Sequence, residues 1–277
     1  MEADKEGVLT EKAIKLMGIT RNDIGRKSLY YNYLDDNNLK YSINPYSNTG
    51  IFSLAKLFEN NIVLVLFLIF TFISADLILS EVGEGSYKIA YTQPYERGKI
   101  YFSKIIAMIL SLTLVLLILL LINFTVNTIA NGTGDFKEPF VVSKNISNLS
   151  LDNENMEFKV ISTGKSVLLN ILLLISVIFF NIAFISTLSV FTDSITKTIG
   201  IEAAFIIFSL LLREFLSTAS IVHAIFPYSY IFVQDVIIQR FKTNYNLGIL
   251  LNIGLAAALA FVGYKKFIKK DFIGSKA

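Results

Sequence analysis

Five long apolar runs constrain this chain more than any other feature of its sequence. Each run has roughly 18 to 25 residues, and a helix of about 20 residues crosses the hydrocarbon core of a bilayer. Hydrophobic residues make up 53% of the 277 residues and charged residues 17%, with a mean hydropathy of +0.58. We therefore predict an all-α polytopic membrane protein. Spans are expected at residues 62–79, 105–128, 166–190, 198–216 and 247–264.

The polar segments between the runs define the rest of the organisation. Residues 1–60 carry charges of both signs and form a polar N-terminal segment, and residues 61–277 form the membrane domain. The loop 129–165 is rich in Asn, Ser and Gly, with a strand expected at MEFKVIS. In 217–246 the apolar stretches are short and interrupted by polar residues, which favours re-entrant or interfacial helices over a further span.

Positive charges beside the runs predict the orientation of the chain. Lysine and arginine are enriched in cytoplasmic loops of membrane proteins. They lie directly after the last run and between the first two runs, at Lys265, Lys266, Lys269 and Lys270 and at Lys88, Arg97, Lys99 and Lys104. Four spans separate these two groups, and an even number of spans returns the chain to the same side of the membrane. Both groups can therefore face the cytoplasm. Residues 1–60, 129–165 and 217–246 are then expected on the outer side.

A polar segment with an ordered motif separates the first two spans, FISADLILSEVGEGSYKIAYTQPYERGKIYFSKII from Phe72 to Ile106. It holds an acidic residue, a Glu-Gly-Ser triplet, a Pro-x-x-Arg motif and a lysine that opens the next span. These positions are Glu81, Glu84, Gly85, Ser86, Pro94, Arg97 and Lys104. The pattern resembles the cytoplasmic connection of ABC-2 type transporter permeases. Ser86 stands where that family usually has threonine, and Glu96 where a small hydroxyl residue is common.

The resemblance extends roughly from Ile62 to Phe272, and FPYSYI around Pro227 also looks like the family. It implies the membrane subunit of an ABC exporter in a bacterial cell membrane, working by alternating access. A coupling helix within 81–104 would dock on a separate ABC ATPase subunit, beside a second or related permease copy. Family members have six spans, so we expect the first span to be missing and residues 1–60 to be the outer segment that follows it.

Several polar residues lie within or near the predicted spans, and polar groups at membrane depth are candidates for function. They are Asp76, Asn170, Asn181, Glu202 and Arg213. The two asparagines are expected to hydrogen-bond between helices. Glu202 and Arg213 are about three helical turns apart, so they share a face but are too distant to pair. Either each pairs with a neighbouring helix or headgroup region, or they line a substrate path.

The last span carries a series of small residues. Small residues let helix backbones approach closely inside a membrane. We expect a neighbouring helix to pack against Gly254, Ala256, Ala257, Ala258 and Ala260.

Other functional classes find little support in the sequence. There is no cysteine and His223 is the single histidine, so no His- or Cys-rich metal site is expected. STGKS at 162–166 lacks the glycine of a phosphate-binding loop, because Lys159 stands there. We predict no cofactor, no metal, no nucleic-acid partner and no enzymatic activity, with ATP hydrolysed by another chain. The alternative is an ATPase-independent membrane immunity or scaffold protein.

Overall fold

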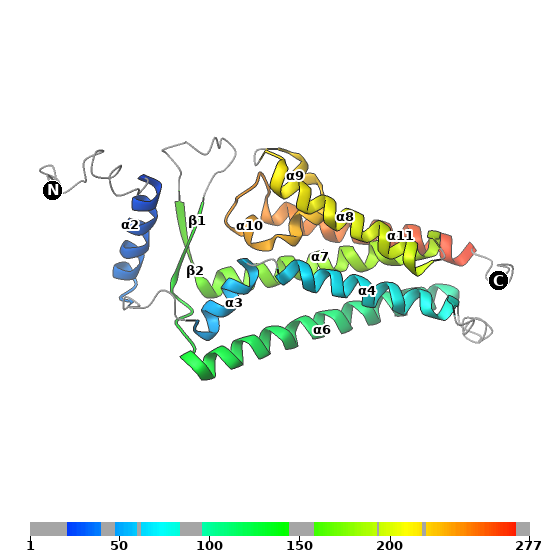
Figure 1. Ribbon diagram of the computed structural model, residues 1–277, viewed down its shortest axis with the longest axis horizontal. Helices are drawn as coiled ribbons and strands as arrows, with labels where there is room; N and C mark the ends of the chain where they lie inside the picture. The colour runs from blue at the N-terminus through cyan, green and yellow to red at the C-terminus, as the bar shows by residue number, and fades with distance from the viewer. Residues whose placement is uncertain are drawn as a thin grey trace, which may run out of the picture.

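The computed structural model describes residues 21–39, 48–59, 62–83, 96–143, 158–192, 194–217 and 220–269, and these are mostly helical (Figure 1). The described elements are, in chain order, α2 (Arg21–Asp36), α3 (Gly50–Glu59), α4 (Ile62–Gly83), α6 (Arg97–Asn131), β1 (Pro139–Ser143), β2 (Phe158–Ser162), α7 (Thr163–Thr192), α8 (Ile195–Phe215), α9 (Val222–Ile225), η1 (Pro227–Ile231), α10 (Val233–Ile237) and α11 (Tyr245–Lys269). Four helices, α6, α7, α8 and α11, are long and apolar enough to cross a membrane, and α3 with α4 makes a fifth if the pair is one bent span. The chain is thus a polytopic membrane protein of four to five candidate spans, as its hydropathy predicts.

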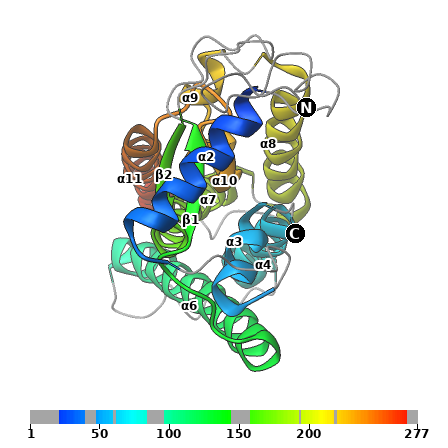
Figure 2. The ribbon, with the colours of Figure 1, turned by 90° about the vertical axis from the view of Figure 1, so that its left-hand side faces the viewer.

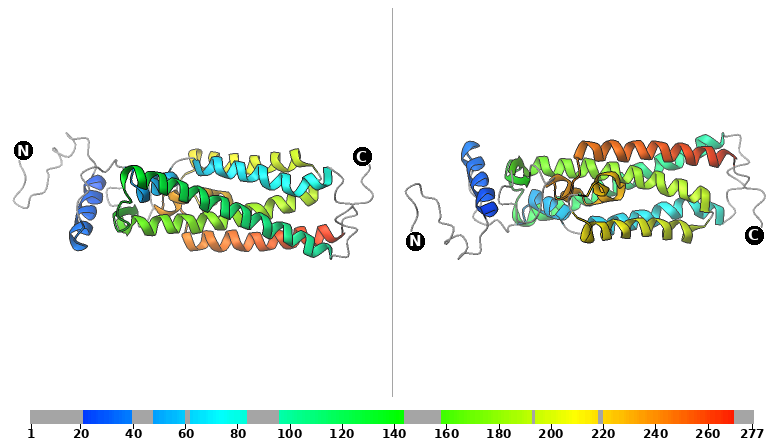
Figure 3. Two further views of the ribbon diagram at one scale, coloured as in Figure 1. Left: turned by 90° about the horizontal axis from the view of Figure 1, so that it is seen from below. Right: turned by 90° about the horizontal axis from the view of Figure 1, so that it is seen from above.

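The long helices run side by side along the molecule, with α7 at the centre (Figures 2 and 3). α7 contacts α3, α4, α6, α8, α10, α11 and η1. Its residues are buried around most of its circumference, including Leu173, Val177, Ile182 and Ile185. A helix that is apolar all round is stable only when other helices or lipid surround it. In this bundle α7 has protein on most sides.

α6 is the longest helix, with 35 residues in one unbroken stretch. Its buried residues recur every three or four positions, which places them on one face. They are Tyr101, Ile105, Met108, Leu112, Leu116 and Leu120. Apolar side chains such as Leu110, Leu114 and Leu121 are exposed on the other faces. This is the distribution expected of a helix with one side against protein and the rest against lipid.

The first span differs from its prediction because the chain bends where a straight helix was expected to begin. The axes of 50–58 and 63–75 meet at 71°. α3 lies upstream of the predicted boundary at residue 60, yet Ile51 and Phe58 are buried in the same core as the long helices. Hydrogen bonds to the end of α6 hold it there: the Gly50 amide donates to the Gly132 carbonyl at 3.0 Å, and the Ser53 hydroxyl to Asn123 Oδ1 at 2.9 Å.

A two-stranded antiparallel sheet follows α6, with Pro139 opposite Ser162 and Ser143 opposite Phe158. The predicted strand MEFKVIS corresponds to β2, whereas its partner β1 was not predicted. The sheet leads directly into α7, because the amides of Thr163 and Gly164 donate to the carbonyls of Glu138 and Phe136 at 2.8 and 3.0 Å. These bonds satisfy amides of the first turn of α7, which have no partner inside a helix.

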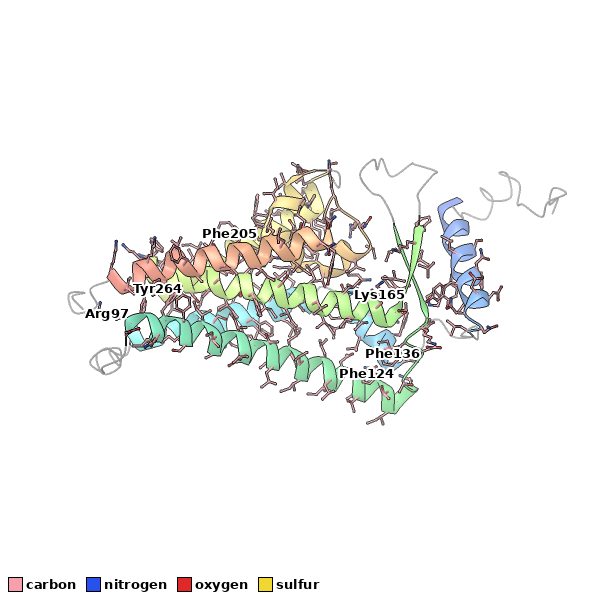
Figure 4. The ribbon with its side chains drawn as sticks, turned by 180° about the vertical axis from the view of Figure 1, so that it is seen from behind. Arg97, Phe124, Phe136, Lys165, Phe205 and Tyr264 are labelled. Carbon is pink, nitrogen blue, oxygen red and sulfur yellow. The ribbon has the colours of Figure 1, made fainter. Side chains whose placement is uncertain are left out.

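α2 packs against both strands and lies across the end of the bundle (Figures 1 and 2). The two ends of the bundle therefore differ. Arg97 and Tyr264 lie at one end, where α4 ends, α6 begins and α11 ends; Phe136 and Lys165 lie at the other, with the sheet and α2 (Figure 4). The elements that flank the predicted bend and tail are thus at the same end.

α11 approaches its neighbours closely at positions other than the predicted small residues. A Cβ atom at Gly248 would lie 2.3 Å from Cε1 of the buried Tyr230 ring, and one at Gly263 would lie 2.1 Å from the Tyr101 hydroxyl. Gly254 instead has open space around it, and Ala257 and Ala258 are exposed. The closest packing therefore uses the two ends of α11. Of the predicted small residues, Ala260 packs against the core, whereas Gly254, Ala257 and Ala258 lie on an outer face.

This difference gives a matched pair of variants on one helix. Gly248→Ala should lower the thermal unfolding temperature of the detergent-purified protein, because overpacking a core costs about 1–3 kcal/mol. Gly254→Ala should leave that temperature unchanged or raise it, since alanine favours the helix. Equal unfolding temperatures for the two variants would contradict the packing of α11 on Tyr230.

Candidate functional site

Glu202 is a fully buried carboxylate in the middle of the bundle. It lies on α8 and faces α7 and η1. The Asn181 amide of α7 and the Tyr228 hydroxyl of η1 both donate to its Oε1. Asn181 Nδ2 also lies 3.5 Å from the Thr71 hydroxyl of α4. Four elements from distant parts of the sequence therefore meet at one carboxylate, which we call the Glu202 network (Thr71, Asn181, Glu202 and Tyr228).

The Glu202 network is only partly satisfied. Glu202 Oε2 has no hydrogen-bond partner among the described residues. Phenylalanine rings surround the Tyr228 ring at centroid distances of 5.2 to 6.2 Å, from Phe180, Phe184, Phe205 and Phe226. Placing a charged carboxylate in such apolar surroundings costs several kcal/mol unless it is paired and hydrogen-bonded. A polar group with spare capacity in this position can bind a proton, a water molecule or a polar part of a substrate.

A second polar cluster lies where α8 ends. Arg213 Nε lies 2.8 Å from Asp235 Oδ2, and Arg240 Nη1 lies 3.7 Å from Asp235 Oδ1. The side chains of Arg213 and Asp235 are 13% and 8% exposed, so this ion pair is buried. Burial raises the pKa of Asp235, and the positive charges of Arg213 and Arg240 act against that rise. The Arg213 guanidinium also lies over the Phe232 ring, 4.5 Å from its centroid.

A hydrogen bond joins the base of α7 to this second cluster. Asn170 Nδ2 donates to Gln234 Oε1 at 2.7 Å. Both side chains are buried, and Asn170 Oδ1 and Gln234 Nε2 have no further partner in the described part of the chain. The short helices 222–237 are thus tied to the bundle by polar bonds from α7 and α8.

The structure brings together some of the predicted site residues and separates others. Asn181 and Glu202 are hydrogen-bonded to each other, whereas Asn170 and Arg213 contact the second cluster through Gln234 and Asp235. Glu202 and Arg213 have different partners, in agreement with their spacing.

The predicted coupling residues are mostly beyond what the structure describes. Glu84, Gly85, Ser86 and Pro94 lie outside the described residues. Asp76 and Glu81 lie on α4, and their side chains also fall outside the described part. The remaining two residues are placed: Arg97 is the first residue of α6, and Lys104 follows it two turns later.

Gly98 is a point of close packing at the start of α6. It lies inside the first turn of α6, where a Cβ atom would be 2.6 Å from Cε2 of the Tyr264 ring on α11. The start of α6 therefore packs closely on the end of α11.

Five residues of the polar clusters were not among the predicted site residues: Thr71, Tyr228, Gln234, Asp235 and Arg240. Tyr228 and Asp235 both lie in the segment 217–246, where polar residues interrupt short apolar stretches. The polar residues that repeatedly interrupt these apolar stretches were the signal in the sequence, because a buried polar residue needs a hydrogen-bond partner. The identity of that partner depends on the tertiary packing and is not encoded in local spacing.

A family model described as "Protein of unknown function (DUF2705)" matches residues 20–273. No curated protein and no solved structure matches the chain.

Two ion pairs that differ in exposure, Arg213–Asp235 and Lys99–Glu96, provide a stability test. Arg213→Met leaves Asp235 buried with only the more distant Arg240, so we expect a loss of about 3–5 kcal/mol in the free energy of unfolding. Lys99→Met breaks the exposed Lys99–Glu96 pair at 3.4 Å and should cost about 0–1 kcal/mol. Unfolding by sodium dodecyl sulfate titration measures both. A loss for Arg213→Met as small as for Lys99→Met would mean that Asp235 is solvated.

Proposed function

We propose that this chain, which belongs to the DUF2705 family, is the membrane subunit of an ATP-driven exporter of the ABC-2 type. A separate ATPase subunit binds segment 81–104 on the cytoplasmic side, and ATP is hydrolysed there. Two permease copies, identical or related, form the transport pathway in a bacterial cell membrane. The ordered motif from Glu81 to Lys104 is the sequence basis of this proposal.

The arrangement of the helix ends is the observation that carries the proposal furthest. The end of α4, the start of α6, the connection between α7 and α8, and the end of α11 all lie at the end of the bundle marked by Arg97 and Tyr264 (Figure 4). A subunit bound to segment 84–95 at that end would act directly on α4 and α6. This supports a role in which movement enters the bundle from one side.

The Glu202 network offers a route for that movement into the bundle. α4 leads into the predicted coupling segment, and its Thr71 lies beside Asn181, which in turn donates to Glu202. A shift of α4 would therefore change the surroundings of a buried carboxylate. We propose that Asn181 and Glu202 line the substrate path, with Glu202 selecting a polar or cationic group. Asn170 and Arg213 instead hold the short helices in place.

The segment 217–246 supports an orientation with the coupling segment in the cytoplasm and this segment on the outer side. It forms α9, η1 and α10, each of five residues or fewer, and residues 228–237 are buried. Short helices packed inside a bundle suit a re-entrant region, which needs its backbone satisfied by protein. In this proposal the region faces outward, with the sheet and α2 as outer loops.

Charge reversal in the coupling segment tests the proposal. The double variant Glu84→Lys, Arg97→Glu should lose co-purification of the ATPase from native membranes, because a docking surface with inverted charges repels its partner. Lys137→Glu makes the same kind of change on an exposed lysine at the opposite end and should retain the ATPase. Mass spectrometry of the affinity-purified complex is the measurement.

Two results would sink the proposal. Recovery of no ATPase with the unaltered chain would favour an ATPase-independent immunity or scaffold protein. Equal recovery with the double variant and the unaltered chain would place the contact elsewhere than segment 81–104.

A further inference from the structure

A cavity of about 480 Å³ lies between the cap of α2 and β1 and the short helices that follow α8. Its lining residues come from α2, β1, α8 and the stretch that follows η1: Lys27, Tyr30, Pro139, Phe140, Val141, Arg213, Gln234, Asp235, Ile238 and Arg240. Small-molecule sites in proteins have volumes of roughly 300–1,000 Å³. The cavity is thus large enough for a ligand, and it lies at the end of the bundle opposite Arg97.

The charges around the cavity are unbalanced. Lys27, Arg213 and Arg240 are cationic, whereas Asp235 is the single carboxylate among the lining residues. Asp235 is shared between the two arginines, at 2.8 and 3.7 Å. The lining therefore carries an excess of two positive charges, and Arg240 is 46% exposed. A concave surface of one sign attracts ligands of the opposite charge.

A buried donor without a partner also belongs to the cavity wall. Gln234 is 4% exposed, and its amide oxygen accepts from Asn170. Its amide nitrogen Nε2 has no acceptor in the described residues. A buried donor left unsatisfied costs about 1–3 kcal/mol, and a turn of the Gln234 side chain toward the cavity would let an acceptor there recover that loss. The lining also has an apolar part, which we call the apolar wall: Pro139, Phe140, Val141 and Ile238.

We propose that this cavity binds the phosphate group of an anionic ligand that also has an apolar part. Guanidinium groups pair with phosphate through charged hydrogen bonds in a fixed geometry, which favours phosphate over halide or other simple anions. The apolar wall accommodates the rest of the ligand. Such a phosphate group has two sources, the headgroup of an anionic phospholipid and a soluble phosphate ester. The site does not depend on whether the chain couples to an ATPase.

Binding by the full-length chain in neutral detergent tests this site with two probes. Glycerol 3-phosphate represents a soluble ester, and phosphatidylglycerol in mixed micelles represents the lipid, with phosphatidylcholine as the zwitterionic comparison. Isothermal titration calorimetry at low ionic strength gives the dissociation constants. We expect one probe to bind, and Arg240→Gln combined with Lys27→Gln to weaken it by about tenfold or more, since each charged hydrogen bond contributes strongly.

Lys242→Gln provides the matched control. Lys242 is an exposed cation two residues from Arg240 and is absent from the cavity lining, so its loss should leave the dissociation constant within about twofold. Unfolding temperatures of all variants verify that they are folded. Arg240 and Lys27 are exposed, so their substitution should leave the fold intact.

The outcomes separate the possibilities. Tighter binding of phosphatidylglycerol than of glycerol 3-phosphate, lost in the double variant, assigns the site to an anionic lipid; the reverse order assigns it to a soluble ester. Binding of neither probe overturns the proposal. Equal weakening by Lys242→Gln and by the double variant also overturns it, because the attraction would then be a general surface charge.

Discussion

The burial of α7 is the constraint on which the rest of the bundle depends. A buried helix cannot leave its polar side chains to water, so they bond to carbonyls of the same helix, as Ser176 and Ser186 do, or to a neighbouring element. Asn170 bonds to Gln234, Asn181 to Glu202, and the Thr187 hydroxyl donates to the Leu259 carbonyl of α11 at 2.8 Å. The bonds of Asn170 and Asn181 leave nearly the same side of α7 at different heights, and the bond of Thr187 leaves another side. They therefore fix how α8, α10 and α11 are rotated around it, which apolar contacts alone would specify less strictly.

This arrangement divides the polar interior by role. The bonds of Asn170 and Arg213 are close to the cap, involve charged or amide partners and tie short helices to long ones. The Glu202 network lies deeper and connects α4, α7, α8 and η1 through a carboxylate with unused hydrogen-bonding capacity. A purely structural buried group is normally fully paired, since half-satisfied networks are unfavourable. The carboxylates of the two clusters differ in this respect: Asp235 lies between Arg213 and Arg240, whereas Glu202 Oε2 has no partner among the described residues. We therefore propose Glu202 for the substrate path and a stabilising role for Asp235.

Hydropathy alone located the long helices, because a run of about 20 apolar residues has few structural alternatives. It missed α3, whose ten residues are too few for a span and which is buried because it packs against α6 and α7. It also missed β1, because Pro139 reads as a turn although proline is tolerated at the first position of a strand. The pairing of Arg213 with Asp235 was beyond reach, since it joins residues on separate helices. The prediction for small residues in α11 was right for Ala260 and wrong for Gly254, Ala257 and Ala258, because residue size does not reveal which face of the helix meets a neighbour.

The uninterrupted course of α6 has a mechanical consequence. No glycine or proline lies between Lys99 and Asn131, and sharp kinks in helices arise almost always at such residues or at local disruptions of the ladder. At 35 residues the helix is about 52 Å long, well beyond the ~30 Å of a hydrocarbon core. It therefore has no internal hinge and must pivot as a rod. A rotation of about 10° around its first turn, where Gly98 meets Tyr264, would displace Asn131 by about 9 Å and would pull α3 and the sheet with it.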